Sequence, residues 1–297
     1  MTRLKANGIE LAWDSFGSAL AEPIVLIAGL GSQMIRWTVP FCTALAARGY
    51  RVIRFDLRDT GQSTYFDHYP APDFAVLTAE LRAGRQPPLA YTLEDTAADV
   101  VGLLDALGIA RAHIVGRSMG GMIAQLLASL YPERVLSLTS IMSSSGNPAL
   151  PAAAPEVMAL MTRPAPDPRL DEDGFVAHGL AFARRIAGTG SPFNVEQHEI
   201  LLREECRRGR SAGGFARQIA AIAACGDRTP GLASITAPAL VIHGADDPVF
   251  LPACGEDTAR AIPGARYMLL AGMGHDLPPA LYETVIEAIA SNCQGPG

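Results

Sequence analysis

The chain has 297 residues, 49% of them hydrophobic and 18% charged, and carries a formal net charge of −6 at pH 7. This length and composition allow a full hydrophobic core and exclude a disordered chain or a small protein that depends on disulfides. The 24 basic residues are outnumbered by 30 acidic ones, which is not the electrostatic footprint of a nucleic-acid-binding protein. No apolar run approaches the ~20 residues that span a bilayer. We therefore expect no nucleic-acid partner and no membrane partner.

The cysteines and the first residues of the chain bear on the compartment. There are five cysteines, an odd number, at wide spacings and without a C-x-x-C pair. That pattern is typical of free thiols in a reducing compartment and predicts neither a disulfide framework nor a metal site. The first eight residues lack the apolar stretch of a secretory signal. We therefore expect a cytoplasmic protein without a bound metal.

The predicted strands begin with a hairpin. Residues 4–16 alternate in hydropathy around Asn7-Gly8, a dipeptide that favours a two-residue hairpin turn. Later strands are predicted from short apolar runs. Because helical stretches separate these runs, we predict an α/β fold with a mostly parallel sheet covered on both faces. The runs are residues 24–28, 52–55, 113–115, 135–142, 239–243 and 267–270.

Two helices stand out beside the strands. Thr92 and Asp95 have the spacing of a capping box at the start of an apolar-periodic stretch that reaches Leu107. Gly108 is predicted to end that helix, because glycine is common just beyond a helix C-terminus. A second apolar-periodic stretch, residues 277–289, predicts a helix near the end of the chain.

The middle of the chain, residues 143–234, contains no clear strand. We interpret it as a helical cap inserted into an α/β core formed by residues 1–142 and 235–297. Residues 65–89 are also long for a simple connection, and loops of that length are often functional. Within the cap, proline and alanine are dense over 148–168, and helical periodicity appears over 175–186, 195–208 and 214–224.

The stretch Gly116-Arg117-Ser118-Met119-Gly120 lies between a predicted strand and a predicted helix. A strand that turns this sharply into a helix strains the backbone of the central residue, and flanking side chains would clash. The glycines are therefore typical of a nucleophile elbow, which exposes the Ser118 hydroxyl at the end of the sheet. That hydroxyl also lies at a helix N-terminus, which favours developing negative charge. We predict Ser118 as the catalytic nucleophile.

The catalytic base is predicted among six histidines. His275 stands in a glycine-rich stretch, residues 271–275, after the last predicted strand and before the last helix. Glycine-rich loops at strand ends let the backbone approach a substrate closely. His275 also comes last in the chain order Ser, acid, His that follows a nucleophile elbow. The other five are interpreted as core or surface residues: His68, His113, His178, His198 and His243.

An acid that orients the imidazole is predicted after the strand 239–243, where Asp246, Asp247 and Pro248 follow. Such an acid fixes the tautomer of the histidine and stabilises the imidazolium. The alternative location, after residue 142, holds serines, a glycine and an asparagine but no carboxylate. Neighbouring side chains point in different directions, so we expect only one aspartate to reach His275. We choose Asp247 and interpret Asp246 as a turn residue.

Two backbone amides are predicted to form an oxyanion hole. One is the N–H of Met119, the residue after the nucleophile. The other is the N–H of Leu30, in the loop Gly29-Leu30-Gly31-Ser32 that follows the first parallel strand. Amides preorganised for the charge of a tetrahedral intermediate are among the largest contributions to catalysis of this kind.

Together these residues resemble the α/β-hydrolase superfamily over essentially the whole chain. Within it, the chain resembles the aclacinomycin methylesterase group, which shares an Arg-Asp-Thr-Gly stretch like residues 58–61 and a Gly-Thr-Gly-x-Pro-Phe stretch like 188–193. The sequence departs from many relatives at Ala28, where they have histidine, and at Arg117, a large charged residue beside the nucleophile. The other carriers of the resemblance are residues 29–31, 56–63, 116–120, 244–248 and 274–275.

The resemblance implies a carboxylic ester hydrolase that works through an acyl-enzyme and needs no cofactor. It also implies Asp247 as the acid, through the Pro-Val that follows it. We expect a small-molecule ester substrate with a bulky, largely apolar acyl part. Three alternatives stay open: a C–C bond hydrolase, a cofactor-free perhydrolase with the same triad, and a non-catalytic ligand receptor. A haloalkane dehalogenase is disfavoured because the elbow holds serine rather than aspartate. The oligomeric state stays open.

Overall fold

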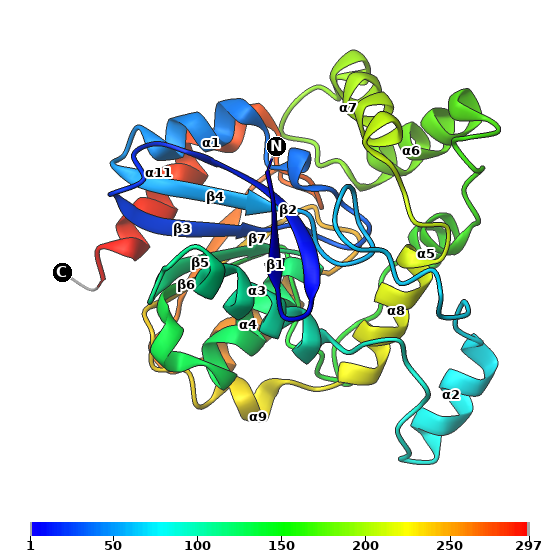
Figure 1. The fold of residues 1–297 in the computed structure, drawn as a ribbon, viewed down its shortest axis with the longest axis horizontal. Helices are drawn as coiled ribbons and strands as arrows, with labels where there is room; N and C mark the ends of the chain where they lie inside the picture. Colours follow the sequence, from blue (N-terminus) through cyan, green and yellow to red (C-terminus); the bar gives the residue numbers. More distant parts are fainter. Residues whose placement is uncertain (1, 296–297) are drawn as a thin grey trace.

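The computed structural model describes residues 2–295 and is built on one eight-stranded sheet, in the order β1-β2-β4-β3-β5-β6-β7-β8 (Figure 1). The pairs β1–β2 and β2–β4 are antiparallel, and the pairs from β4 to β8 are parallel. This confirms the predicted α/β class with a mostly parallel sheet. The strands are β1 (Thr2–Ala6), β2 (Ile9–Phe16), β3 (Glu22–Ile27), β4 (Tyr50–Phe55), β5 (Ala112–Arg117), β6 (Val135–Ile141), β7 (Ala239–Gly244) and β8 (Arg266–Leu270).

The N-terminal hairpin is confirmed. Asn7 and Gly8 both have positive φ, at 47° and 78°, which is the backbone of a two-residue hairpin turn matched to the twist of the strands. β1 and β2 pair from Ala6 with Ile9 outward. The hairpin forms one edge of the sheet and β8 forms the other, so β3, β5 and β7 lie in its interior.

Helices cover both faces of the sheet. Helices α3 and α4 lie on one face, and α1 and α11 lie on the other (Figure 1). The α-helices are α1 (Val39–Ala46), α2 (Phe74–Arg82), α3 (Leu93–Ala106), α4 (Met119–Leu130), α5 (Pro155–Thr162), α6 (Glu172–Ile186), α7 (Val195–Arg208), α8 (Gly214–Cys225), α9 (Thr229–Leu232), α10 (Pro252–Ala261) and α11 (Tyr282–Cys293). Short 3-10 helices are η1 (Met34–Arg36), η2 (Pro132–Arg134) and η3 (Pro279–Leu281). None of the helices within residues 2–295 combines the length and the apolar character needed to cross a membrane.

Alternation along β3 divides the core into two layers. Val25 and Ile27 belong to the buried cluster beneath α3 and α4, whereas Ile24 and Leu26 belong to the cluster beneath α1 and α11. Successive side chains of a strand point to opposite faces, so a strand covered on both faces is apolar throughout. Burial on both faces therefore explains the continuous apolar run from which this strand was predicted.

The ends of two predicted helices can be compared with the capping and periodicity signals in the sequence. The capping box of α3 is present, because the Thr92 side chain accepts from Asp95 N–H while the Asp95 side chain accepts from Thr92 N–H. The C-terminal helix was predicted to begin at residue 277, which is wrong, because α11 begins at Tyr282. Pro278 and Pro279 lie between these positions and have no N–H to donate, so a 3-10 turn precedes the helix instead.

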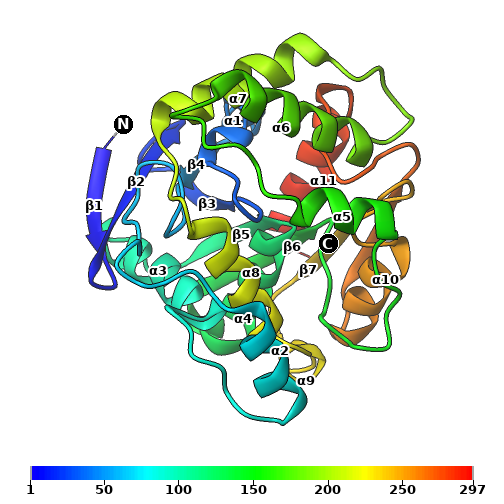
Figure 2. The same ribbon diagram turned by 90° about the vertical axis from the view of Figure 1, so that its right-hand side faces the viewer.

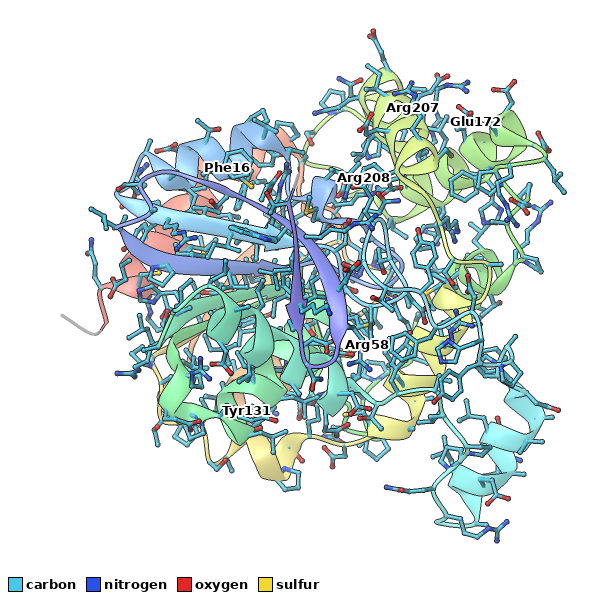
Figure 3. The ribbon with its side chains drawn as sticks, viewed as in Figure 1. Phe16, Arg58, Tyr131, Glu172, Arg207 and Arg208 are labelled. Carbon is cyan, nitrogen blue, oxygen red and sulfur yellow. The ribbon has the colours of Figure 1, made fainter. Side chains whose placement is uncertain are left out.

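The segment between β6 and β7, called the insertion below, carries α5 to α9 (Figure 2). Helices α6 and α7 pack together beyond the end of the sheet. Helix α9 instead packs against α4 and α10, two of the helices that cover the sheet. The division into a core and a cap at 143–234 stays a prediction. Figure 3 shows Arg208 where α7 faces the sheet, with Arg207 and Glu172 on the outer side.

Two helices escaped the sequence reasoning. Helix α2 lies inside the connection 65–89 and projects from the body of the molecule (Figure 1). Its Asp73 N-cap accepts from the amides of Ala75 and Val76, and Phe74, Leu77 and Leu81 recur at helical spacing, so the sequence carried signals for this helix that the surrounding prolines obscured. Helix α5 begins with Pro155 at its first position, where proline is tolerated. No helix was predicted over 148–168, where proline and alanine are dense.

Candidate active site

Ser118 lies at the turn between β5 and α4, with φ 55° and ψ −123°, a strained backbone for a residue other than glycine. The glycines around it explain how so tight a turn fits. A Cβ atom on Gly116 would lie 2.0 Å from the Gly120 carbonyl oxygen, and one on Gly120 would lie 2.3 Å from the Ile27 carbonyl oxygen. The turn is also held by Ser143, whose hydroxyl donates to the Ser118 carbonyl over 2.8 Å. The structure therefore has the elbow that the motif predicts.

Ser118, His275 and Asp247 form one hydrogen-bonded series. His275 Nε2 lies 2.9 Å from Ser118 Oγ, and His275 Nδ1 lies 2.8 Å from Asp247 Oδ2. Because a carboxylate can only accept, Nδ1 carries the proton and Nε2 is free to accept from the serine hydroxyl. The structure thus brings together the three side chains predicted for nucleophile, base and acid, across 157 and 28 residues of sequence.

The environment of Asp247 suits an orienting acid. Its side chain is buried, and Oδ1 accepts from the amides of Val249 at 2.8 Å and Phe250 at 3.0 Å. Oδ2 is left to face the imidazole. The ring of Phe250 packs edge-on against the His275 ring, with centroids 5.6 Å apart. Both oxygens of the buried carboxylate are therefore hydrogen-bonded, as a buried charge requires.

Asp246 points elsewhere. Its Oδ2 accepts from the Thr189 amide at 3.0 Å and from the Thr189 hydroxyl at 2.5 Å. These hydrogen bonds to Thr189 lower the pKa of the Asp246 carboxyl. The residue interpreted as a turn position thus also fastens the insertion to the loop after β7. Nothing local in the sequence could show this contact, because Thr189 is 57 residues away.

His243 is a neighbour of the acid that sequence reasoning assigned to packing alone. It ends β7, is fully buried, and its Nε2 lies 3.6 Å from Asp247 Oδ2 and 2.7 Å from the Phe250 carbonyl oxygen. Burial lowers the pKa of His243, so the ring is neutral and its Nε2–H donates to that carbonyl. The ring therefore supports the turn that carries Asp247 without adding a charge beside it.

The loop of residues 29–32, called the oxyanion loop below, lies directly against the nucleophile. A Cβ atom on Gly29 would lie 3.1 Å from the Ser118 Cβ atom. Leu30 is the next residue of this loop, and Met119 is the first residue of α4, so its N–H has no partner within the helix. The structure thus places Gly29, the neighbour of Leu30, against Ser118, and the two amides as oxyanion donors stay a prediction.

A hollow lies beside the oxyanion loop, under the insertion. Its lining includes Gly31 and Thr60 on one side and Phe175, Arg210 and Phe215 on the other. The ring of Phe175 lies under the Arg210 guanidinium, 4.8 Å from its carbon. The hollow has a volume of about 20 Å³, which is room for a water molecule, and Ser118, Asp247 and His275 are not among the residues that line it.

Asp276 joins the loop of His275 to α7. Its Oδ2 lies 3.2 Å from His198 Nε2. Burial opposes ionisation of Asp276, but the hydrogen bond to His198 and the nearby Arg117 and Arg36 outweigh it and lower its pKa to about 2. The Arg117 guanidinium, singled out as unusual beside the nucleophile, lies over the Trp37 ring. Within residues 2–295, no group of three His, Cys, Asp or Glu side chains is arranged to hold a metal ion.

Known proteins are similar to this chain in sequence and in fold. Rhodomycin D methylesterase DnrP from Streptomyces peucetius is 30% identical over 98% of this chain and 97% of its own length. The corresponding DauP protein from Streptomyces sp. (strain C5) is 31% identical with the same coverage. The crystal structure of the enol-lactonase from Burkholderia xenovorans LB400 matches 99% of this chain and all of its own, with a TM-score of 0.72 and 25% identity. A family model described as alpha/beta hydrolase fold matches residues 22–189, and the chain belongs to that family.

Proposed function

We propose that this protein is a serine hydrolase that cleaves a carboxylic ester through an acyl-enzyme. In this proposal Ser118 is the nucleophile, His275 the general base and Asp247 the acid that orients the imidazole. The observation that carries it is the hydrogen-bonded series of these three side chains at the N-terminus of α4. The likeness to two methylesterases supports an ester as the substrate. The proposal requires no cofactor, because each step uses groups of the chain and water.

The first half of the reaction acylates the enzyme. Ser118 Oγ attacks the ester carbonyl carbon while its proton moves to His275 Nε2. The carbonyl oxygen becomes an oxyanion, which accepts hydrogen bonds from the Met119 and Leu30 amides. When the tetrahedral intermediate collapses, the bond to the leaving alcohol breaks and that alcohol takes the proton from His275.

The second half releases the acid. His275 Nε2 takes a proton from water as the water oxygen attacks the acyl carbon. The new tetrahedral intermediate collapses, the bond to Ser118 Oγ breaks, and the serine recovers its proton from His275. Asp247 stays ionised throughout and holds the imidazolium that forms in each half.

The proposed substrate has a bulky, largely apolar acyl part and a small alcohol. The likeness to two methylesterases supports this, and the Phe215 ring of the insertion lies against Gly31 beside the nucleophile. Each methylene group removed from water contributes roughly 0.8 kcal/mol, so a large acyl group should bind far better than acetate. We further propose that residues 143–234 act as the cap that selects this group.

A panel of substrates tests this function. We expect kcat/KM for methyl esters of bulky aromatic acids to exceed that for methyl acetate by at least about 100-fold, since about four buried methylene equivalents supply that difference. A preference for acetate would contradict the proposed substrate class. Turnover confined to a vinylogous diketone would favour the C–C bond hydrolase, and stoichiometric binding without turnover of any compound would favour the receptor.

A further inference from the structure

Helix α8 of the insertion reaches the oxyanion loop through one side chain. Gln218 is 2% exposed, and its Oε1 accepts from the Gly31 amide at 2.8 Å. Its Nε2 donates to the Arg58 carbonyl oxygen and to Thr60 Oγ1, each at 3.0 Å. A reversed amide group would set a donor against the Gly31 N–H, so the three partners together define the orientation of the Gln218 side chain.

The Gly31 amide belongs to the central peptide of the turn that the oxyanion loop forms. Ser32 N–H donates to the Gly29 carbonyl oxygen at 3.1 Å, which closes a four-residue turn. Gly31 has a φ of +62° at the third position, as in a type II turn, whereas a type I turn has negative φ there. The two types differ by rotation of the central peptide, whose N–H belongs to Gly31. By accepting from that N–H, Gln218 favours one of the two orientations.

The same helix restrains the loop by contact. A Cβ atom on Gly31 would lie 2.7 Å from Cδ2 of the Phe215 ring, which stands one turn before Gln218 on α8. The loop is therefore confined between the Phe215 ring, the Gln218 amide and Ser118. Leu30, whose N–H is the proposed second oxyanion donor, lies within this confined turn.

Helix α8 is itself anchored by the stretch 58–61, which the proposed chemistry does not use. Arg217 donates to both oxygens of Asp59, at 2.7 Å and 2.9 Å, and both side chains are buried. A Cβ atom on Gly214 would lie 2.6 Å from the Asp59 carbonyl oxygen, so the first turn of α8 sits directly on this stretch. The Arg-Asp-Thr-Gly stretch thus fixes the position of the first turns of α8.

We propose that Gln218 is a positioning residue, which holds the oxyanion loop in the turn that directs the Leu30 amide toward the reacting carbonyl. The inference rests on the proposed function. It assigns the insertion a part in transition-state stabilisation as well as in enclosing the substrate.

The test substitutes Gln218→Met, which keeps the length of the side chain and removes its hydrogen bonds. We expect kcat for a methyl ester to fall by about 10- to 100-fold with little change in KM, since losing one oxyanion donor outright costs about 10²–10³. A trifluoromethyl ketone, which forms a tetrahedral oxyanion on the serine, should lose affinity by the same factor. The matched control is Gln125→Met, a buried glutamine on α4 with partners Ser140 and Arg228, which should leave both quantities unchanged.

The results that would overturn the role of Gln218 can be told apart from those that would overturn the proposed function. Unchanged kcat and unchanged affinity for the ketone in a folded Gln218→Met variant overturn the proposal, whatever happens to the melting temperature. If Gln218→Met does not fold, Gln218→Asn keeps an amide that cannot reach Gly31, and the same two measurements apply. Absence of ester turnover by the wild-type protein overturns the proposed function and this inference with it. Normal wild-type turnover with an unaffected variant overturns this inference alone.

Discussion

The two halves of the candidate site are held to the insertion by different kinds of contact. On the histidine side, two contacts join backbone to backbone, with His275 N–H donating to the Ile186 carbonyl oxygen at 2.8 Å and Gly190 N–H donating to the Gly272 carbonyl oxygen at 2.9 Å, beside the side-chain contacts of Asp246 and Asp276. On the oxyanion side the contacts are made by buried side chains, chiefly Gln218 and Arg217. The histidine side therefore depends on the absence of side chains at a few glycines, and the oxyanion side depends on the identity of a few polar residues.

This difference determines which substitutions each half of the site tolerates. Close backbone packing fails when a Cβ atom is added, whereas a buried polar pair fails when one partner is removed. Of the four predictions below, the first breaks a contact within the candidate triad and the other three break contacts with the insertion, and they run from the largest expected effect to the smallest.

The acid of the histidine side should give the largest effect. Asp247→Asn should lower kcat by about 10⁴, because an amide at this position stabilises the wrong imidazole tautomer. Asp246→Asn should cost less than about 10-fold, since its carboxylate bonds to Thr189 and does not reach His275. Steady-state rates of the two variants, made in parallel, measure the ranking. The reverse ranking would mean that Asp246 is the catalytic acid.

On the oxyanion side, Arg217→Met should destabilise the fold by about 3 kcal/mol, because it leaves the buried Asp59 carboxylate without its cation. The Tyr91 hydroxyl and the Phe66 amide still donate to that carboxylate, which keeps the loss at the lower end of the range for buried pairs. Urea unfolding gives the free energy. The control Arg207→Met breaks an exposed pair with Glu204 and should cost less than about 0.5 kcal/mol. Equal losses of unfolding free energy in the two variants would contradict the claim that the buried pair with Asp59 stabilises the fold more than the exposed pair with Glu204.

Gly188→Ala should disturb the histidine side through backbone packing. A Cβ atom there would lie 2.0 Å from the Gly272 carbonyl oxygen and 2.4 Å from the Gly274 amide nitrogen. We expect a loss of about 1–3 kcal/mol, as for overpacking elsewhere, together with a lower kcat because the loop of His275 must shift. Gly231→Ala, on α9, meets ordinary contacts at 3.5 Å and serves as the control. A Gly188→Ala variant as stable and active as the wild type would show that this packing yields easily.

The smallest effect concerns His198, the side chain of α7 that meets Asp276. Burial lowers the pKa of His198, but its hydrogen bonds to Asp276 and to the Asn194 carbonyl oxygen outweigh burial and the nearby Arg36, so the pKa is raised. A histidine with a raised pKa stabilises the fold below its unfolded pKa, near ~6.5, and loses that contribution as pH rises through the folded pKa. His198→Gln should therefore cost up to about 1 kcal/mol at pH 5.5 and less at pH 8.5.

His178 provides a control of opposite sign. Burial and the nearby Arg163 and Arg210 lower its pKa, so the folded state disfavours its charged form. His178→Gln should thus gain stability relative to the wild type at pH 5.5 and show little change at pH 8.5. Thermal unfolding of the two variants across this pH range measures both. Parallel curves for the two substitutions would contradict the pairing of His198 with Asp276.

Much of the fold could be predicted because its signals are local. The turn at Asn7-Gly8, the capping box at Thr92 and the apolar run of β3 each depend on residues a few positions apart. The start of α11 was misjudged where apolar periodicity overlaps with Pro278 and Pro279. Helix α2 was missed because prolines on both sides of it favour a loop, although Phe74, Leu77 and Leu81 have helical spacing.

The candidate site divides in the same way. Ser118 and the neighbourhood of Asp247 follow from motifs at the ends of predicted strands. The contact of Gln218 with Gly31 joins residues 187 positions apart, and no local pattern encodes which side of α8 faces that turn. Pairing at this distance is decided by packing of the whole insertion, and so it became visible only in three dimensions.

Covalent labelling of Ser118 tests the central proposal most directly. The protein is treated with a fluorophosphonate, digested, and the peptides are examined by mass spectrometry. We predict one phosphonylated peptide, modified at Ser118, with loss of ester turnover in proportion to labelling and no adduct in a folded Ser118→Ala variant. An adduct on another residue that tracks the loss of activity, or full ester turnover by the Ser118→Ala variant, would contradict the account.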